Sequence, residues 1–201
     1  MHTICIWKDN KECNECIIKE KLICHFKSKY LLSFLGFFAI FVITSVVGVI
    51  LAGYGWFLLG WVGFWLFFFE FWEIRILCSH CPYYAENSKT LHCIANYGSI
   101  KLWKYHPEPM NISEKIQLII GFIILVGYPL FFLILGNQFV FLITGIIELI
   151  IFFSFLKLRR CKRCLNFSCP LNNVEKELVD SFLKKNPIMK KAWEDKGYKI
   201  E

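Results

Sequence analysis

Residues 30–69 read YLLSFLGFFAIFVITSVVGVILAGYGWFLLGWVGFWLFFF and contain no charged side chain. A membrane-spanning helix needs about 20 apolar residues, so this stretch predicts two helices folded back on each other. Residues 116–156 form a second apolar block, in which Glu148 is the one charged side chain. Turn residues lie near the middle of each block, at Gly53-Tyr54-Gly55 and at Gly136-Asn137-Gln138. The sequence therefore predicts an all-α integral membrane protein with four transmembrane helices arranged as two hairpins.

The two hairpins divide the chain into five segments. They are an N-terminal cysteine cluster (1–29), a first hairpin (30–77, with helices at about 30–52 and 56–77), a cysteine-containing connection (78–114), a second hairpin (115–157, with helices at about 115–135 and 138–157) and a C-terminal segment (158–201) with a cysteine cluster and amphipathic helices. In the C-terminal segment, an apolar stripe at helical spacing is expected either to pack on the cysteine-rich segments or to bind a partner. The stripe consists of Val174, Leu178, Val179, Phe182 and Leu183.

The distribution of charge predicts the orientation of the hairpins. All 23 lysines and arginines lie in the three non-spanning segments or at the helix ends beside them, and neither reversal contains one. Cytoplasmic loops carry the Lys/Arg excess, so we expect a protein of the cell membrane with both termini cytoplasmic. The net charge of +7 favours binding to the anionic headgroups of the lipid bilayer, which is an expected partner. No nucleic-acid-binding motif accompanies the charge, and no nucleic acid is expected as a partner.

The ten cysteines fall in the same three segments and form three clusters. The first cluster consists of Cys5, Cys13, Cys16 and Cys24, the second of Cys78, Cys81 and Cys93 with His80 and His92, and the third of Cys161, Cys164 and Cys169. Thiols stay reduced in the cytoplasm, where such spacings indicate metal binding rather than disulfides. The four cysteines of the first cluster are enough for one tetrahedral zinc site. We therefore expect a cytoplasmic metal-binding domain assembled from the N-terminal, middle and C-terminal segments.

The second and third clusters repeat a pattern. Gly53 precedes Cys78 by 25 positions, Gly136 precedes Cys161 by 25 positions, and each of these cysteines begins a Cys-x-x-Cys pair. This indicates an internal repeat of two hairpins. If the second and fourth helices are neighbours, Cys78, Cys81, Cys161 and Cys164 can share one ion, with Cys93, Cys169, His80 and His92 as remaining or substitute ligands. In the competing arrangement, Cys161, Cys164 and Cys169 close on their own segment.

Zinc is the metal that the spacings favour, because structural zinc sites stabilise segments too small to fold alone. An iron–sulfur cluster is the alternative, since Cys169 is followed by Pro170 as in ferredoxins. The ferredoxin pattern, however, is Cys-x2-Cys-x2-Cys-x3-Cys-Pro, from which the third cluster departs. No haem is expected, because no histidine lies within a predicted span to serve as an axial ligand.

One stretch resembles a known enzyme family. Ser79-His80-Cys81-Pro82-Tyr83, followed by Asn96-Tyr97 after Cys93, is similar to the Asp-His-His-Cys-Pro-Trp region of DHHC-type protein S-acyltransferases. The resemblance implies that Cys81 is an acylated nucleophile and His80 a zinc ligand. It departs from the family where Ser79 stands in place of the catalytic histidine and Cys78 in place of the aspartate.

The abundance of metal ligands without a complete catalytic set predicts a non-enzymatic metalloprotein. We expect a membrane-anchored, cytoplasm-facing protein with structural zinc sites that support docking of a cytoplasmic or membrane protein partner. The alternatives are an iron–sulfur electron-transfer membrane subunit and a cysteine-dependent acyltransferase. Glu148, near the middle of the fourth helix, is expected to be neutral and hydrogen-bonded to another helix, with Thr44 and Ser45 of the first helix at a similar depth.

Overall fold

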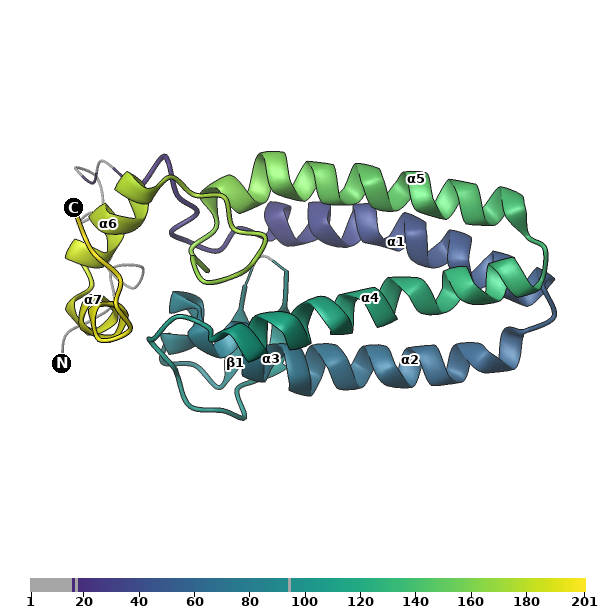
Figure 1. Ribbon diagram of the computed structural model, residues 1–201, viewed down its shortest axis with the longest axis horizontal. Helices are drawn as coiled ribbons and strands as arrows, with labels where there is room; N and C mark the ends of the chain where they lie inside the picture. The colour runs from purple at the N-terminus through teal and green to yellow at the C-terminus, as the bar shows by residue number, and fades with distance from the viewer. Residues whose placement is uncertain (1–15, 17, 94) are drawn as a thin grey trace.

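The computed structural model describes residues 16, 18–93 and 95–201. It contains four helices that are long and apolar enough to cross a membrane, and they lie side by side in one elongated bundle (Figure 1). These four spans are Ser28–Leu51, Gly55–His80, Ile112–Leu135 and Phe139–Arg163. The predicted membrane-spanning architecture of two hairpins is confirmed to this extent.

The chain reverses at the two predicted turns. The first span is helix α1 (Ser28–Leu51), and it ends just before Gly53, whose φ of +82° favours glycine. The third span is helix α4 (Ile112–Leu135), and Asn137 after it has a φ of 54°. Asparagine tolerates this left-handed conformation better than most residues do. Uncharged turn residues therefore close both hairpins.

The packing of the helices bears on whether the second and fourth spans are neighbours, the condition stated for a shared ion. The second span begins with η2 (Gly55–Phe57) and α2 (Leu58–Phe67), and α2 packs on α4. The fourth span begins with α5 (Phe139–Phe155), which packs on α1 and α4. The condition that the second and fourth spans are packed neighbours is not met by α2 and α5, because α4 lies between α2 and the α1–α5 pair (Figure 1).

The second and fourth spans end in the same way. In the second span, a π-helical turn η3 (Phe68–Trp72) and α3 (Glu73–Ile76) lead to a 3-10 turn η4 (Cys78–His80). In the fourth, a π-helical turn η6 (Leu156–Arg160) leads to a 3-10 turn η7 (Cys161–Arg163). Turns of π-helix are rare and are often found at functional sites. This shared succession supports the internal repeat, and each copy ends in a Cys-x-x-Cys pair.

The connection between the hairpins contains a structure that the all-α prediction missed. After the short 3-10 turn η5 (Pro82–Ala85), strands β1 (Thr90–His92) and β2 (Tyr97–Ile100) form an antiparallel pair. Leu91 is buried between partly exposed neighbours, and Gly98 has a φ of +90°. Strands of three and four residues are too short to show an alternating sequence pattern. The all-α prediction is therefore wrong at this hairpin.

The C-terminal helices cover the cysteine-rich segments. Helices α6 (Lys176–Lys184) and α7 (Pro187–Glu194) lie beside the end of the bundle where Cys78 and Cys161 are found, which we call the cysteine end (Figure 1). The apolar stripe of α6 is buried in one cluster with apolar side chains from the other two segments. That cluster includes Ile18, Leu22, Cys81, Leu165, Phe182 and Leu183. The stripe therefore packs on the cysteine-rich segments, one of its two predicted roles.

Candidate functional site

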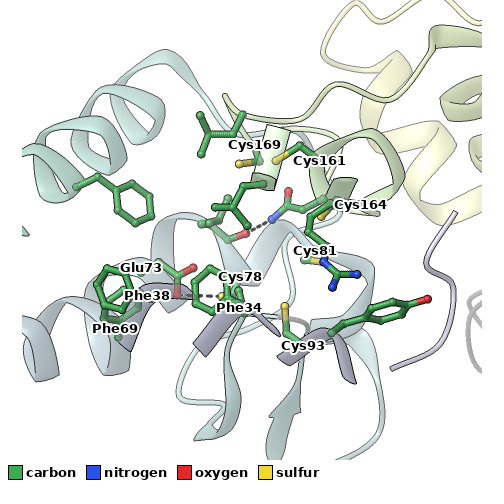
Figure 2. Close-up of a pocket in the computed structure, with 18 of the residues that line it drawn as sticks. Phe34, Phe38, Phe69, Glu73, Cys78, Cys81, Cys93, Cys161, Cys164 and Cys169 are labelled. Atoms are coloured by element: carbon green, nitrogen blue, oxygen red, sulfur yellow. Dashed lines mark hydrogen bonds between the residues drawn. The ribbon is translucent and has the colours of Figure 1, made fainter. Parts of the chain in front are cut away.

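Six cysteines line one cavity at the cysteine end of the bundle. The cavity has a volume of about 150 Å³. Its cysteines come from the end of the second span, the β-hairpin and the end of the fourth span with the loop that follows (Figure 2). They are Cys78, Cys81, Cys93, Cys161, Cys164 and Cys169. The structure thus brings the second and third clusters together in what we call the six-cysteine cavity.

Local backbone geometry presents each Cys-x-x-Cys pair in the same way. The first cysteine of each pair begins a 3-10 turn, and the second ends it in an extended conformation. Cys81 has φ −85° and ψ 138°, and Cys164 has φ −79° and ψ 135°. In the first pair, the Cys81 amide donates to the Cys78 carbonyl at 2.9 Å. The two sulfurs of a pair can therefore face one space.

A buried asparagine connects the loop after the fourth span to the end of the second span. Asn166 is 7% exposed, and its Nδ2 donates to the Leu77 carbonyl at 3.0 Å, one residue before Cys78. The loop is braced from the other side by Asn172, whose Nδ2 donates to the carbonyls of Cys164 and Asn166, both at 2.9 Å. The sequence analysis missed both residues. Their place beside a Cys-x-x-Cys pair is the signal that marks them.

Burial favours the protonated form of cavity thiols that lie outside the spans. Cys78 is 5% and Cys81 is 4% exposed. Burial, with the nearby Cys93 and Cys164 adding to it, raises the pKa of Cys81 well above its ordinary value. Burial also raises the pKa of Cys169 to about 11. A metal that binds here must therefore displace protons from thiols, and its affinity will rise with pH.

The donor chemistry of the cavity suits a soft metal ion, because thiolates select zinc and iron–sulfur clusters. The positions of the side chains do not form a coordination sphere. Within residues 16, 18–93 and 95–201, no three His, Cys, Asp or Glu side chains are placed to hold one ion. Cys78 Sγ instead donates to Glu73 Oε2 at 3.2 Å. The cavity thus supplies a suitable set of thiols, and its metal remains a prediction.

The two predicted histidine ligands point elsewhere. His80 Nδ1 lies 2.7 Å from the Glu108 carbonyl oxygen, and its Nε2 lies 3.3 Å from Glu114 Oε2. His92 Nδ1 lies 2.9 Å from Glu86 Oε2. Neither histidine is among the residues that line the six-cysteine cavity. Their roles as substitute ligands stay predictions that the geometry does not support.

The first cluster can be followed only in part. Cys5 and Cys13 lie outside the described residues. Cys16 Sγ lies 3.4 Å from Lys185 Nζ, which donates to it. Cys24 is buried and lines a second cavity of about 260 Å³ with His25, His92 and Glu86 among others. The predicted four-cysteine site of this cluster stays a prediction.

The stretch that resembles S-acyltransferases lacks the setting of a thiol nucleophile. Ser79, which stands where the family has its catalytic histidine, is buried and donates to the Arg75 carbonyl at 2.5 Å. His80 is directed at Glu108 and Glu114. A reactive thiol needs a lowered pKa or an adjacent base, whereas the pKa of Cys81 is raised. The geometry therefore does not favour acyl transfer by Cys81.

Comparison of the chain with protein-family models, curated proteins and solved structures gives no match. Glu148, near the middle of the fourth span, has a partner on the first span, because Thr44 Oγ1 donates to Glu148 Oε1 at 2.9 Å. This confirms the expected hydrogen bond between the fourth and first spans.

Proposed function

We propose that this chain is a membrane-anchored metalloprotein in which the six-cysteine cavity binds zinc. The observation that carries the proposal is the convergence of two Cys-x-x-Cys pairs, from two different hairpins, on one buried cavity. Cys78, Cys81, Cys161 and Cys164 would supply the four thiolates of a structural site. Cys93 and Cys169 lie beside them in the same cavity.

The proposed role of the metal is to hold small segments in place. The β-hairpin and the loop after Cys161 have few residues, and Asn166 is the side chain that bonds this loop to the second span. Segments of this size gain folding free energy from a structural zinc site. Zinc has no redox chemistry, so its contribution here is structural: it would replace the thiol protons and join the ends of the two hairpins.

Orientation and partner docking belong to the same proposal. The lysines and arginines beside the cysteine end favour the cytoplasmic side, where the thiols would stay reduced. The stripe of α6 is buried on the cysteine-rich segments, so a protein partner would meet an assembled surface rather than a free helix. A reporter enzyme fused after Glu201 should be active inside the cell, and activity outside would contradict this orientation.

Metal analysis of the full-length protein tests the proposal. Protein purified without oxygen and with reductant should be colourless and contain zinc. Cys81→Ser and Cys164→Ser should each lose about one equivalent of zinc, because each leaves a three-ligand site. Asn87→Ala, a change at an exposed position of the same connection, is the matched control and should keep all of it.

Two results would contradict the proposal. Full zinc content in both cysteine variants would show that the cavity is not the site. A brown protein that contains iron and no zinc would favour the electron-transfer alternative, in which thiolates hold an iron–sulfur cluster.

A further inference from the structure

The six-cysteine cavity extends from the thiols into the membrane-spanning bundle. There it is lined by side chains from all four spans, and nearly all of this lining is apolar. The lining includes Phe34 and Phe38 of the first span, Phe69 of the second, Phe122 and Leu125 of the third, and Phe152 of the fourth. A thiol-binding metal occupies only the end of such a space, so the apolar part needs a separate explanation.

The size of the cavity suits a hydrocarbon chain. One water molecule needs about 10–15 Å³ of such space, and the cavity has about 150 Å³. It can therefore take about ten groups of the size of a water molecule or a methylene. Apolar cavities of this size stay dry and accept apolar molecules. Inside a membrane, the nearest apolar molecules are the acyl chains of lipids.

The packing of the helices provides an entrance from the bilayer. Both α1 and α2 pack on α4. Among the described residues, α1 and α2 pack less closely on each other than each packs on α4. Phe34 and Phe38 line the cavity from the first span and Phe69 lines it from the second. A chain can thus enter between the first and second spans.

Arg160 lines the cavity at the cysteine end and lacks an anionic partner. Its guanidinium lies 4.6 Å from the centre of the Tyr30 ring, and its Nη2 donates to Ser33 Oγ. Its Nε is buried and has no hydrogen-bond partner among the described residues. In the described part of the chain, no carboxylate forms an ion pair with it. Because an unsatisfied buried donor is costly, the Nε of Arg160 is expected to bind a hydrogen-bond acceptor.

A phosphate group supplies that acceptor. Arginine binds phosphate through several N–H groups, and its charge strengthens each hydrogen bond. Arg160 lies in η6, near the end of the fourth span, with Lys157 and Arg159. Anionic headgroups gather around basic residues at such a level. From this position a lipid can place its headgroup at the cysteine end and one acyl chain between the spans.

We infer that the cavity binds one anionic phospholipid, with its phosphate at Arg160 and one acyl chain between the four spans. The chain would close the apolar side of the six-cysteine cavity and keep water from the thiols. This inference does not rest on the zinc proposal, because the chain and the thiols use different walls of the cavity.

Native mass spectrometry of the full-length protein tests the inference. The protein is reconstituted in vesicles of phosphatidylglycerol and phosphatidylcholine in equal amounts and then extracted in mild detergent. The wild type should retain one phosphatidylglycerol per chain. Val126→Phe fills the cavity and should lose the lipid, whereas Ile123→Phe adds the same ring on the exposed face of α4 and should keep it.

A second pair of variants tests the headgroup contact. Arg160→Gln removes the charge at the cavity and should weaken retention of phosphatidylglycerol about tenfold, the effect of losing one charge-assisted hydrogen bond. Arg159→Gln removes a charge at an exposed neighbouring position and should retain the lipid. This pair remains informative even if Val126→Phe does not fold.

Three results would overturn the inference: wild-type protein without lipid, equal retention in Val126→Phe and wild type, or equal retention of phosphatidylcholine and phosphatidylglycerol. Zinc content is measured in the same samples. Lipid without zinc would refute only the proposed function, and zinc without lipid would refute only this inference.

Discussion

Replacing Asn166 by alanine should loosen the attachment of the loop after the fourth span to the second span. Asn166 Nδ2 donates to the Leu77 carbonyl at 3.0 Å, and the side chain is 7% exposed. Its Oδ1 also accepts from Ser168 Oγ at 3.2 Å. Alanine leaves the half-buried Leu77 carbonyl with only the weaker bond from the His80 amide, at 3.3 Å. It leaves the buried Ser168 hydroxyl without this acceptor.

The expected size of the effect follows from the environment of the bond. Leaving a buried polar group unsatisfied costs about 1–3 kcal/mol. A value of about 2 kcal/mol corresponds to a roughly 30-fold increase in the population of the open loop, since 1.4 kcal/mol is tenfold. Cys81 is 4% exposed and shares an apolar cluster with Leu165, which precedes Asn166. Opening of the loop should therefore uncover the Cys81 thiol.

The assay measures how fast each cysteine reacts with a maleimide in protein stripped of metal. When opening and closing are fast, the rate at a buried thiol is proportional to the population of the open state. Peptide mass spectrometry then assigns the rate to each cysteine. Cys81 in Asn166→Ala should react about 30-fold faster than in wild type. Asn87→Ala changes an exposed asparagine of the connection and should leave the rate unchanged.

Two outcomes would refute the reasoning. If Cys81 reacts at the same rate in Asn166→Ala, wild type and Asn87→Ala, the hydrogen bond to Leu77 does not hold the loop. If every cysteine reacts faster by the same factor, the substitution lowers the stability of the whole fold rather than the attachment of one loop.

Three further predictions concern the bundle and its thiols. A Cβ at Gly121 would overlap a ring from η3, so Gly121→Ala should lower stability to thermal unfolding by about 1–3 kcal/mol, whereas Gly127→Ala, with open space, should not. Burial raises the pKa of Cys169 from 9.0 to about 11. Its contribution to the stability of metal-free protein is therefore present below about pH 9 and lost as pH rises towards 11, which thermal unfolding across this range will show. Thr44→Val should lower the free energy of unfolding by about 0.6–1.7 kcal/mol through loss of the bond to Glu148, and Thr44→Ser should restore it.

Some elements outside the spans could be predicted from the sequence and others could not. The tail helices were expected, because the apolar residues of the tail recur at helical spacing, and α6 carries them on one face. The β-hairpin was not expected, because its strands are too short for alternation to be visible. Asn166 and Arg160 were also missed. The place of Asn166 beside a Cys-x-x-Cys pair marks it as a candidate, but the carbonyl that it bonds lies far away in the sequence. Arg160 has no local pattern that shows it to line a cavity between four helices.

Local sequence alone determined the number of spans and the positions of their reversals. Long uncharged stretches must be helical in a bilayer, where every backbone group needs a partner within the segment, and uncharged turn residues interrupt them once each. Spacing also showed that each hairpin ends in a Cys-x-x-Cys pair. Tertiary structure decided how these pairs meet. Helix packing depends on where small residues and large rings face each other, so α2 packs on α4 while α5 packs on α1 and α4. The two pairs line one cavity although α2 and α5 are not packed neighbours. The 3-10 turns at the ends of the spans and the hydrogen bond from Asn166 to Leu77 bring the pairs together.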